Sequence, residues 1–164
     1  MIGGDQSELR AALQTALAVP RVVDEVAAQA PFDDLDALLE AHRAAATPLS
    51  AAELDQALAH HPRIGERPAG EGAAQAFSRR EQASADADDP ALAAALAAGN
   101  AAYEGRFGRV FLVCAAGRSR AEILAELERR LANDPESELA EAAEQLRQIA
   151  ALRLAQSLVP EGIA

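Results

Sequence analysis

The chain has 164 residues, of which half are hydrophobic but only 3% aromatic, and its formal net charge is -11. This acidity argues against binding to nucleic acid or to anionic membrane surfaces, since neither attracts an acidic protein. The single cysteine, Cys114, excludes an internal disulfide bond, and no apolar run is long enough to cross a bilayer. The length suits one domain, residues 1–164, with a single hydrophobic core.

Alanine supplies much of the hydrophobic content, which favours close-packed helices over a β-sandwich. Leucines spaced four apart predict a first helix over residues 6–18, and Pro20 can open a second. Asp33 or Asp34 can cap a third helix. A capping-box pattern, Ser50–Glu53, begins a short fourth helix.

The stretch after the fourth helix carries the polar residues best suited to chemistry. It opens with a His-His-Pro turn, passes through a loop with prolines and glycines, and enters an alanine-rich segment that we expect to be helical. On a helix, Ser78, Glu81 and Gln82 project from one face, because they are three or four positions apart. His61 precedes Pro62, which restricts its backbone. These groups could serve acid–base chemistry, although S-x-x-E is equally a capping box.

The other histidines and the cysteine offer weaker signals. His42 and His60 are interpreted as structural, hydrogen-bonded to carbonyl oxygens at helix ends. Three histidines without metal-type spacing make a zinc site unexpected, so we predict no metal. Cys114 lies in an apolar run, which disfavours a reactive thiolate.

The second half of the chain contains one β-like run among helices. A helix is expected over residues 90–103, with Gly105 and Gly108 bracketing a turn after it. Residues 110–115 are apolar and β-like, but a single strand cannot form a sheet. We therefore expect a buried extended connector whose unpaired backbone groups need partners, and a bound ligand is one candidate.

Two more helices complete the predicted fold. A second capping-box pattern, Ser119–Glu122, begins one, and the last spans about residues 136–158. The fold class that follows is all-α, a single compact domain of about eight helices with one short extended connector segment.

An arginine in the last helix falls at a position that should face the core. The apolar stripe of this helix continues from Leu146 to Arg153, seven residues later, with Leu152 and Leu154 beside it. A buried guanidinium is costly without a partner. Arg153 could pair with an internal acid such as Glu81, bind an anionic ligand, or extend along the helix end into water.

Several segments, taken in order, are similar to a known family. HHPRIGER, SRREQ, NAAYEGRFGRVFLVCAAGRS and QIAALRL resemble the 2-oxo-4-hydroxy-4-carboxy-5-ureidoimidazoline (OHCU) decarboxylases of urate degradation. The resemblance covers about residues 15–158, and the ordered series is more specific than any one segment.

The resemblance implies an all-helical, dimeric enzyme that needs no metal or organic cofactor. Its catalytic histidine falls on His61, acting as acid or base with Glu81. Its other substrate-binding positions fall on Pro62, Ser78, Gln82, Arg153 and the backbone of Val113, Cys114, Ala115, Ala116 and Gly117.

The implied reaction is the decarboxylation of OHCU to (S)-allantoin by a carbon–carbon lyase. The expected partners are a small-molecule ureide and a second copy of the chain, with no nucleic acid and no membrane. The chain lacks a secretory signal and a peroxisomal tripeptide, so a cytoplasmic location is expected. The alternative is a metal-independent helical binding module, or a hydrolase acting on a related ureide.

Overall fold

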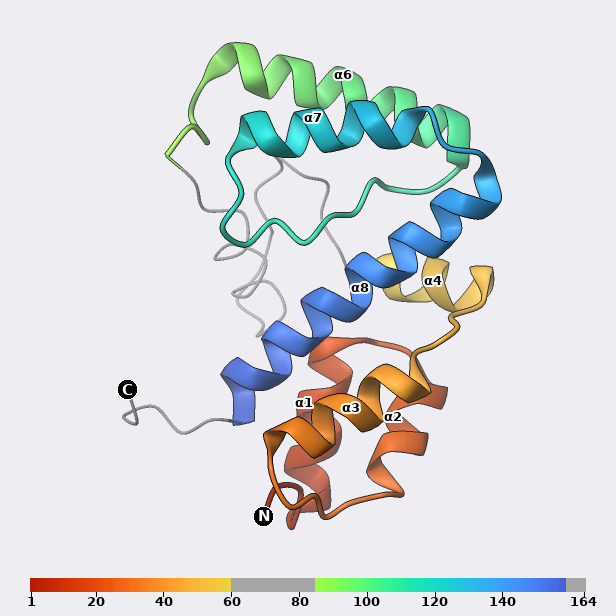
Figure 1. Ribbon diagram of the computed structural model, residues 1–164, viewed down its shortest axis with the longest axis vertical. Coiled ribbons are helices and arrows are strands. Elements are labelled where there is room, and N and C mark those ends of the chain that lie inside the picture. The colour runs from red at the N-terminus through yellow and green to blue at the C-terminus, as the bar shows by residue number, and fades with distance from the viewer. Residues whose placement is uncertain (60–84, 159–164) are drawn as a thin grey trace. The chain divides into compact units, whose positions relative to one another are not determined.

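The computed structural model describes residues 1–59 and 85–158 (Figure 1). Within these ranges the chain forms seven helices and no strand, and one isolated β-bridge joins Ile2 to Phe32. The predicted all-α class is confirmed, although about eight helices were expected. The remaining expected helix, which carries Ser78, lies outside the described residues.

The chain divides into two compact units. The first unit contains Met1–Ala57 together with the chain from Leu146 onwards, and the second contains Leu58–Gln145. The last helix contributes its first part to the second unit and its remainder to the first. A single domain over residues 1–164 therefore stays a prediction.

The helices of the first unit begin where the sequence provides caps. α1 (Gln6–Ala16) follows Asp5, whose carboxylate accepts hydrogen bonds from the backbone N–H groups of Ser7 and Glu8. α2 (Pro20–Ala27) has its proline in the first turn, where the missing N–H costs no helical hydrogen bond.

The next two helices also start at predicted caps. α3 (Leu35–Ala45) begins after Asp34, which accepts from the N–H of Ala37 at 2.8 Å. α4 (Ala51–Leu58) has a complete capping box, because Ser50 and Glu53 each bind the other's backbone N–H at 3.1 Å. Arg21 also binds the Glu53 carboxylate at 2.6 Å and holds the pKa of that carboxyl below its usual range.

The core of the first unit is built from the predicted leucine and valine stripes. α1 and α2 contact each other, as do α2 and α3. The leucines and valines that are at most 1% exposed in this unit are Leu9, Leu13, Leu17, Val19, Val22, Val26, Leu38, Leu54, Leu146 and Leu154.

In the second unit, α6 (Pro90–Phe107) is longer than predicted. It begins after the Asp89 cap and continues through Gly105, so the expected turn between Gly105 and Gly108 is wrong. Tyr103 is fully buried in the adjacent core, and this packing outweighs the roughly 1 kcal/mol cost of an interior glycine. The helix ends at Gly108, whose φ of 74° is a left-handed cap that glycine adopts without strain.

α7 and α8 follow the predicted starts closely. α7 (Arg120–Leu131) has the predicted capping box between Ser119 and Glu122. α8 (Pro135–Leu158) begins one residue before the prediction, after Asp134, whose carboxylate accepts from the backbone N–H of Ser137. α6 and α7 pack side by side, and a Cβ on Gly99 would stand 2.4 Å from Leu127 Cδ2.

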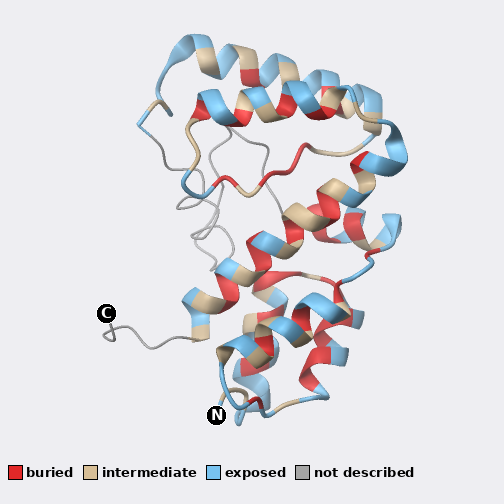
Figure 2. Cartoon of the chain, in the orientation of Figure 1, coloured by how far each residue is buried: buried red, intermediate tan, exposed pale blue. Residues whose placement is uncertain are grey.

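The connector, defined as residues 110–117, is buried at positions 111–113 and 115 and forms no strand, as predicted. Residues 110–115 have no helix or strand assignment, and residues 116–117 form a turn. Figure 2 shows the burial along this segment. Alternate side chains, at positions 111, 113 and 115, enter one core cluster, which is the two-residue period of an extended chain. The cluster contains Leu96, Tyr103, Phe111, Val113, Ala115, Ile123 and Leu127.

Among the described helices, none has both the length and the apolar character needed to cross a membrane.

Candidate functional site

The predicted site residues fall into three groups. His61, Pro62, Ser78, Glu81 and Gln82 lie outside the described residues, so their roles stay predictions. The connector belongs to the second unit and Arg153 to the first.

Two side chains hold the backbone of the connector from neighbouring helices. The guanidinium of Arg130 donates a hydrogen bond to the carbonyl oxygen of Leu112. The N–H of Cys114 donates to the Oε1 atom of Gln145 at 2.8 Å. The peptide groups on both sides of Val113 are therefore fixed by α7 and α8.

The chain turns sharply after these contacts. The N–H of Arg118 donates to the carbonyl oxygen of Ala115 at 3.0 Å, and Gly117 has a φ of 76°. A left-handed backbone at this position favours glycine. The turn carries the chain from the buried connector into the exposed positions Ala116 and Gly117 and on to the α7 cap.

Val113 is the buried centre of the connector. Its residue exposure is 2%, yet neither its N–H nor its C=O makes a hydrogen bond within residues 1–59 and 85–158. Buried backbone groups are nearly always paired. The connector thus has the unpaired backbone groups that were predicted, and their binding to a ligand stays a prediction.

Behind the connector lies a buried ion pair that was not predicted. Arg130 and Glu138 are both 0% exposed, and the Nε of Arg130 donates to Glu138 Oε1 at 2.9 Å. The hydroxyl of Tyr103 donates to the same oxygen at 2.5 Å, and the Asn133 amide donates to Glu138 Oε2 at 3.1 Å. The cluster leaves the carboxylate fully bonded, as a buried charge requires.

Two aromatic rings lie close to the guanidinium of this ion pair. The Arg130 guanidinium carbon lies 4.8 Å from the ring centroid of Phe111 and 5.9 Å from that of Tyr103. Burial, and then the hydrogen bond to Glu138, raise the pKa of Tyr103 well above its ordinary value. Tyr103 is the only tyrosine in the chain.

The same periodicity that identified Arg153 could have identified these residues. Arg130 continues the α7 stripe of Ile123 and Leu127, and Glu138 stands four residues before Ala142 on the α8 stripe. Gln145 had no comparable signal, because a half-buried glutamine on a helix is common.

Arg153 lies where the helical spacing predicted. It is 3% exposed, so the alternative in which it extends into water is wrong. Its guanidinium donates to the carbonyl oxygen of Thr15 at 3.4 Å. Leu154 is fully buried beside it, whereas Leu152 is 39% exposed, so the expected apolar surroundings exist on one side only. Binding of an anionic ligand and pairing with an internal acid stay predictions for this side chain.

His42 is structural, but not in the predicted way. It lies in the last turn of α3, is 2% exposed, and its Nε2 has no hydrogen-bond partner among the described residues. The expected hydrogen bond of this nitrogen to a helix-end carbonyl is absent from the described structure. Burial lowers the pKa of His42 from 6.5 to about 4, so the ring is neutral at pH 7.

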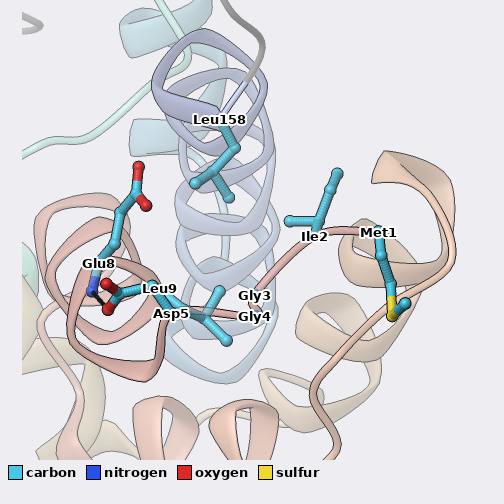
Figure 3. A pocket seen from close by; sticks show the side chains of 8 residues that line it. All are labelled: Met1, Ile2, Gly3, Gly4, Asp5, Glu8, Leu9 and Leu158. Atoms are coloured by element: carbon cyan, nitrogen blue, oxygen red, sulfur yellow. Dashed lines mark hydrogen bonds between the residues drawn. The ribbon is translucent and has the colours of Figure 1, made fainter.

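A cavity of about 330 Å³ lies at the start of the chain (Figure 3). It is lined by Met1, Ile2, Gly3, Gly4, Asp5, Glu8, Leu9 and Leu158. The Asp5 carboxylate already caps α1, and none of the predicted site residues lines the cavity. Within the described ranges, no three histidine, cysteine, aspartate or glutamate side chains are grouped to hold a metal ion.

The fold is similar to that of a solved structure of OHCU decarboxylase in the presence of (S)-allantoin. The TM-score is 0.74 at 23% identity, and the match covers 93% of this chain and 97% of that one. At this level of identity, the similarity shows a shared fold.

Three curated relatives match at higher identity. The chain is 39% identical over 104 residues to the uric acid degradation bifunctional protein TTL of Arabidopsis thaliana, covering 61% of this chain and 32% of that protein. It is 40% identical over 99 residues to the OHCU decarboxylase of Amia calva, covering 57% and 55%, respectively. It is 35% identical over 140 residues to the OHCU decarboxylase of Mus musculus, covering 82% and 77%. The chain thus spans about a third of the length of the Arabidopsis thaliana protein and just over half of the length of the Amia calva enzyme.

The family model for OHCU decarboxylase matches residues 4–155, nearly the whole chain. With the mouse relative matched over most of both chains, this shows that the chain belongs to the OHCU decarboxylase family.

Proposed function

We propose that this chain catalyses the decarboxylation of OHCU to (S)-allantoin in urate degradation. The observation that carries the proposal is the family match over residues 4–155. The buried connector adds a physical reason, since the backbone groups of Val113 suit a ligand rich in amide groups.

The chemistry of the substrate explains why no cofactor is needed. OHCU carries its carboxylate on a carbon adjacent to an imine carbon. When carbon dioxide leaves, the electrons of the broken C–C bond flow into the C=N bond, so the substrate itself provides the electron sink. The protein must then hold the substrate, move a proton, and present that proton to one face.

The residues proposed for proton transfer come from the matched motifs. His61 handles the substrate hydroxyl or the proton delivered after decarboxylation, because an imidazole both gives and accepts protons near neutral pH. Glu81 orients the hydroxyl and partners the histidine. Pro62, Ser78 and Gln82 contact the substrate.

The described residues are proposed to bind the rest of the substrate. Arg153 grips an anionic or carbonyl group through paired donors, for which a planar guanidinium is suited. Its burial is consistent with this role, because desolvation strengthens charge recognition. The connector backbone, from Val113 to Gly117, binds the planar ureide.

The proposal extends to the state of the protein in the cell. We propose that the chain acts as a homodimer in the cytoplasm and folds as a single domain over residues 1–164. The family resemblance supports the dimer, and gel filtration with light scattering measures it directly.

The test generates OHCU from urate in situ and follows the rate of allantoin formation. The wild-type protein is expected to accelerate this rate, and His61→Asn is expected to lower turnover by roughly a hundred- to ten-thousand-fold with folding unchanged. The adjacent His60→Asn is the matched control and should keep most of the activity. Cys114→Ser should also lose little.

Each contrary outcome identifies a different error. An unchanged spontaneous rate with the wild-type protein rejects the decarboxylase. Near-normal turnover of His61→Asn removes His61 from the mechanism. Loss of activity on chelation would indicate a metal-dependent enzyme instead.

A further inference from the structure

At its centre, the connector makes hydrogen bonds along one of its two edges only. Arg130 donates a hydrogen bond to the carbonyl oxygen of Leu112, and Gln145 accepts one from the N–H of Cys114. These two groups flank Val113, whose own N–H and C=O make no hydrogen bond within the described part of the chain.

Peptide geometry fixes where the Val113 groups point. In a planar trans peptide the C=O and the N–H point in opposite directions. The N–H of Val113 shares a peptide with the Leu112 carbonyl, so it points away from Arg130. The C=O of Val113 shares a peptide with the Cys114 N–H, so it points away from Gln145.

Val113 therefore presents one donor, its N–H, and one acceptor, its C=O, on the same edge of an extended segment. In an antiparallel sheet, a residue in this state exchanges two hydrogen bonds with the residue opposite. A ureide carries the same N–H and C=O pair on one edge. A ureide can therefore pair with Val113 as a neighbouring antiparallel strand would.

We infer that Gln145 is a positioning residue that sets the rotation of the Val113 peptide groups toward the ureide edge of the substrate. Arg130 supports the same arrangement, and its charge is balanced by Glu138, whose other bonds come from Tyr103 and Asn133. Gln145 itself does not touch the reacting atoms. The inference rests on the proposed decarboxylase function.

The surroundings of Gln145 indicate that its side chain orients the connector backbone and contributes little to core packing. Its side chain is half-buried, whereas the adjacent α8 positions Ala142 and Leu146 are at most 1% exposed and form the packed face. Loss of the carboxamide oxygen removes an acceptor and leaves the apolar packing in place. The consequence should appear in substrate affinity.

The test compares two substitutions at this position. Gln145→Met has similar length but no acceptor, and it should raise KM about tenfold while kcat stays within about threefold, as expected when uniform binding is lost. Gln145→Glu keeps an oxygen acceptor and should restore KM to within about threefold of wild type. Gln156→Met, an exposed glutamine on the same helix, is the matched control and should not change either constant.

The outcomes separate this inference from the proposed function. A wild-type protein that does not accelerate allantoin formation rejects the function itself. An active wild type with an unchanged KM in Gln145→Met rejects only the positioning role, as does an equal loss in the Glu variant.

A measurement on the wild-type protein decides the question even where Gln145→Met does not fold. Saturation with (S)-allantoin, followed in an amide-resolved NMR spectrum, should shift the Val113 amide more than the Cys114 amide. A Val113 amide that does not respond, or the reverse order, overturns the inference.

Discussion

Two buried ionisable side chains, one in each unit, show opposite responses to burial. In the second unit, Arg130 is fully buried but binds the Glu138 carboxylate and a backbone carbonyl. In the first unit, His42 is almost as buried, but its Nε2 has no hydrogen-bond partner among the described residues. The paired group keeps its charge, whereas burial keeps the unpaired ring neutral at pH 7.

The difference reflects what each side chain does for the fold. A guanidinium cannot lose its proton at any ordinary pH, so its burial requires partners. Those partners here also fix the connector. The imidazole can become neutral and then packs as an apolar group in α3. The comparison therefore predicts which changes the two units tolerate.

Removing Arg130 should have the largest effect. Arg130→Met leaves Glu138 buried without its cation and should lower the free energy of unfolding by about 3–5 kcal/mol. Urea denaturation at pH 7 measures this change. In the double variant Arg130→Met with Glu138→Leu, most of that stability should return, because no uncompensated charge remains. Failure of the double variant to recover would show that the charges themselves stabilise the unit.

Acidification should destabilise the first unit through His42. The folded pKa of about 4 is below the ordinary 6.5, so the unfolded chain binds more protons between these pH values. Stability is full above about pH 6.5 and falls as the pH approaches 4, by about 3 kcal/mol in total.

The His42 contribution is isolated by comparing variants. Carboxylates such as Glu53, held at low pKa by Arg21, also lose stability in acid, so total stability alone is not informative. In His42→Leu the fall between pH 7 and pH 4 should be smaller than in wild type by about 3 kcal/mol. Identical pH profiles for the two proteins would contradict the assignment.

Tyr103→Phe should have an intermediate effect. It removes the hydroxyl donor to Glu138 but leaves Arg130 and Asn133 in place, so the expected loss is about 1–2 kcal/mol. In the wild type, the raised pKa of this only tyrosine predicts that no phenolate absorbance develops at pH 11 while the protein stays folded. Ionisation at the ordinary pKa of about 10 in the folded protein would contradict the buried hydrogen bond.

The capping boxes should give the smallest and most similar effects. Ser50→Ala in the first unit and Ser119→Ala in the second each remove one hydrogen bond at an exposed helix start, which costs about 1 kcal/mol. Thermal unfolding of both variants measures the loss. Similar values would show that the units differ in their buried polar groups and not in their helix ends.

Local signals in the sequence predicted most of the fold. Caps at Asp34, Ser50 and Ser119 began helices where expected, because these contacts involve neighbouring residues only. The end of α6 was missed because Gly105 suggests a break, whereas tertiary packing of Tyr103 decides the outcome. The ion pair of Arg130 and Glu138 was not predicted, since the two residues are eight positions apart and meet across a turn.

The candidate site was predictable to a different extent in each part. Helical spacing placed Arg153 correctly in a buried position without any structure. The connector was recognised as buried and unpaired, but the support from Gln145 was not, because it depends on a contact between residues 31 positions apart. The roles of His61 and Glu81 rest on motif resemblance and stay predictions.

The handedness of the product tests the central claim most directly. OHCU is generated from urate with and without the wild-type protein, and the circular dichroism of the allantoin formed is followed over time. We predict rapid appearance of the (S) enantiomer alone, because one proton donor faces one side of the substrate. Racemic allantoin formed at the spontaneous rate would contradict the account.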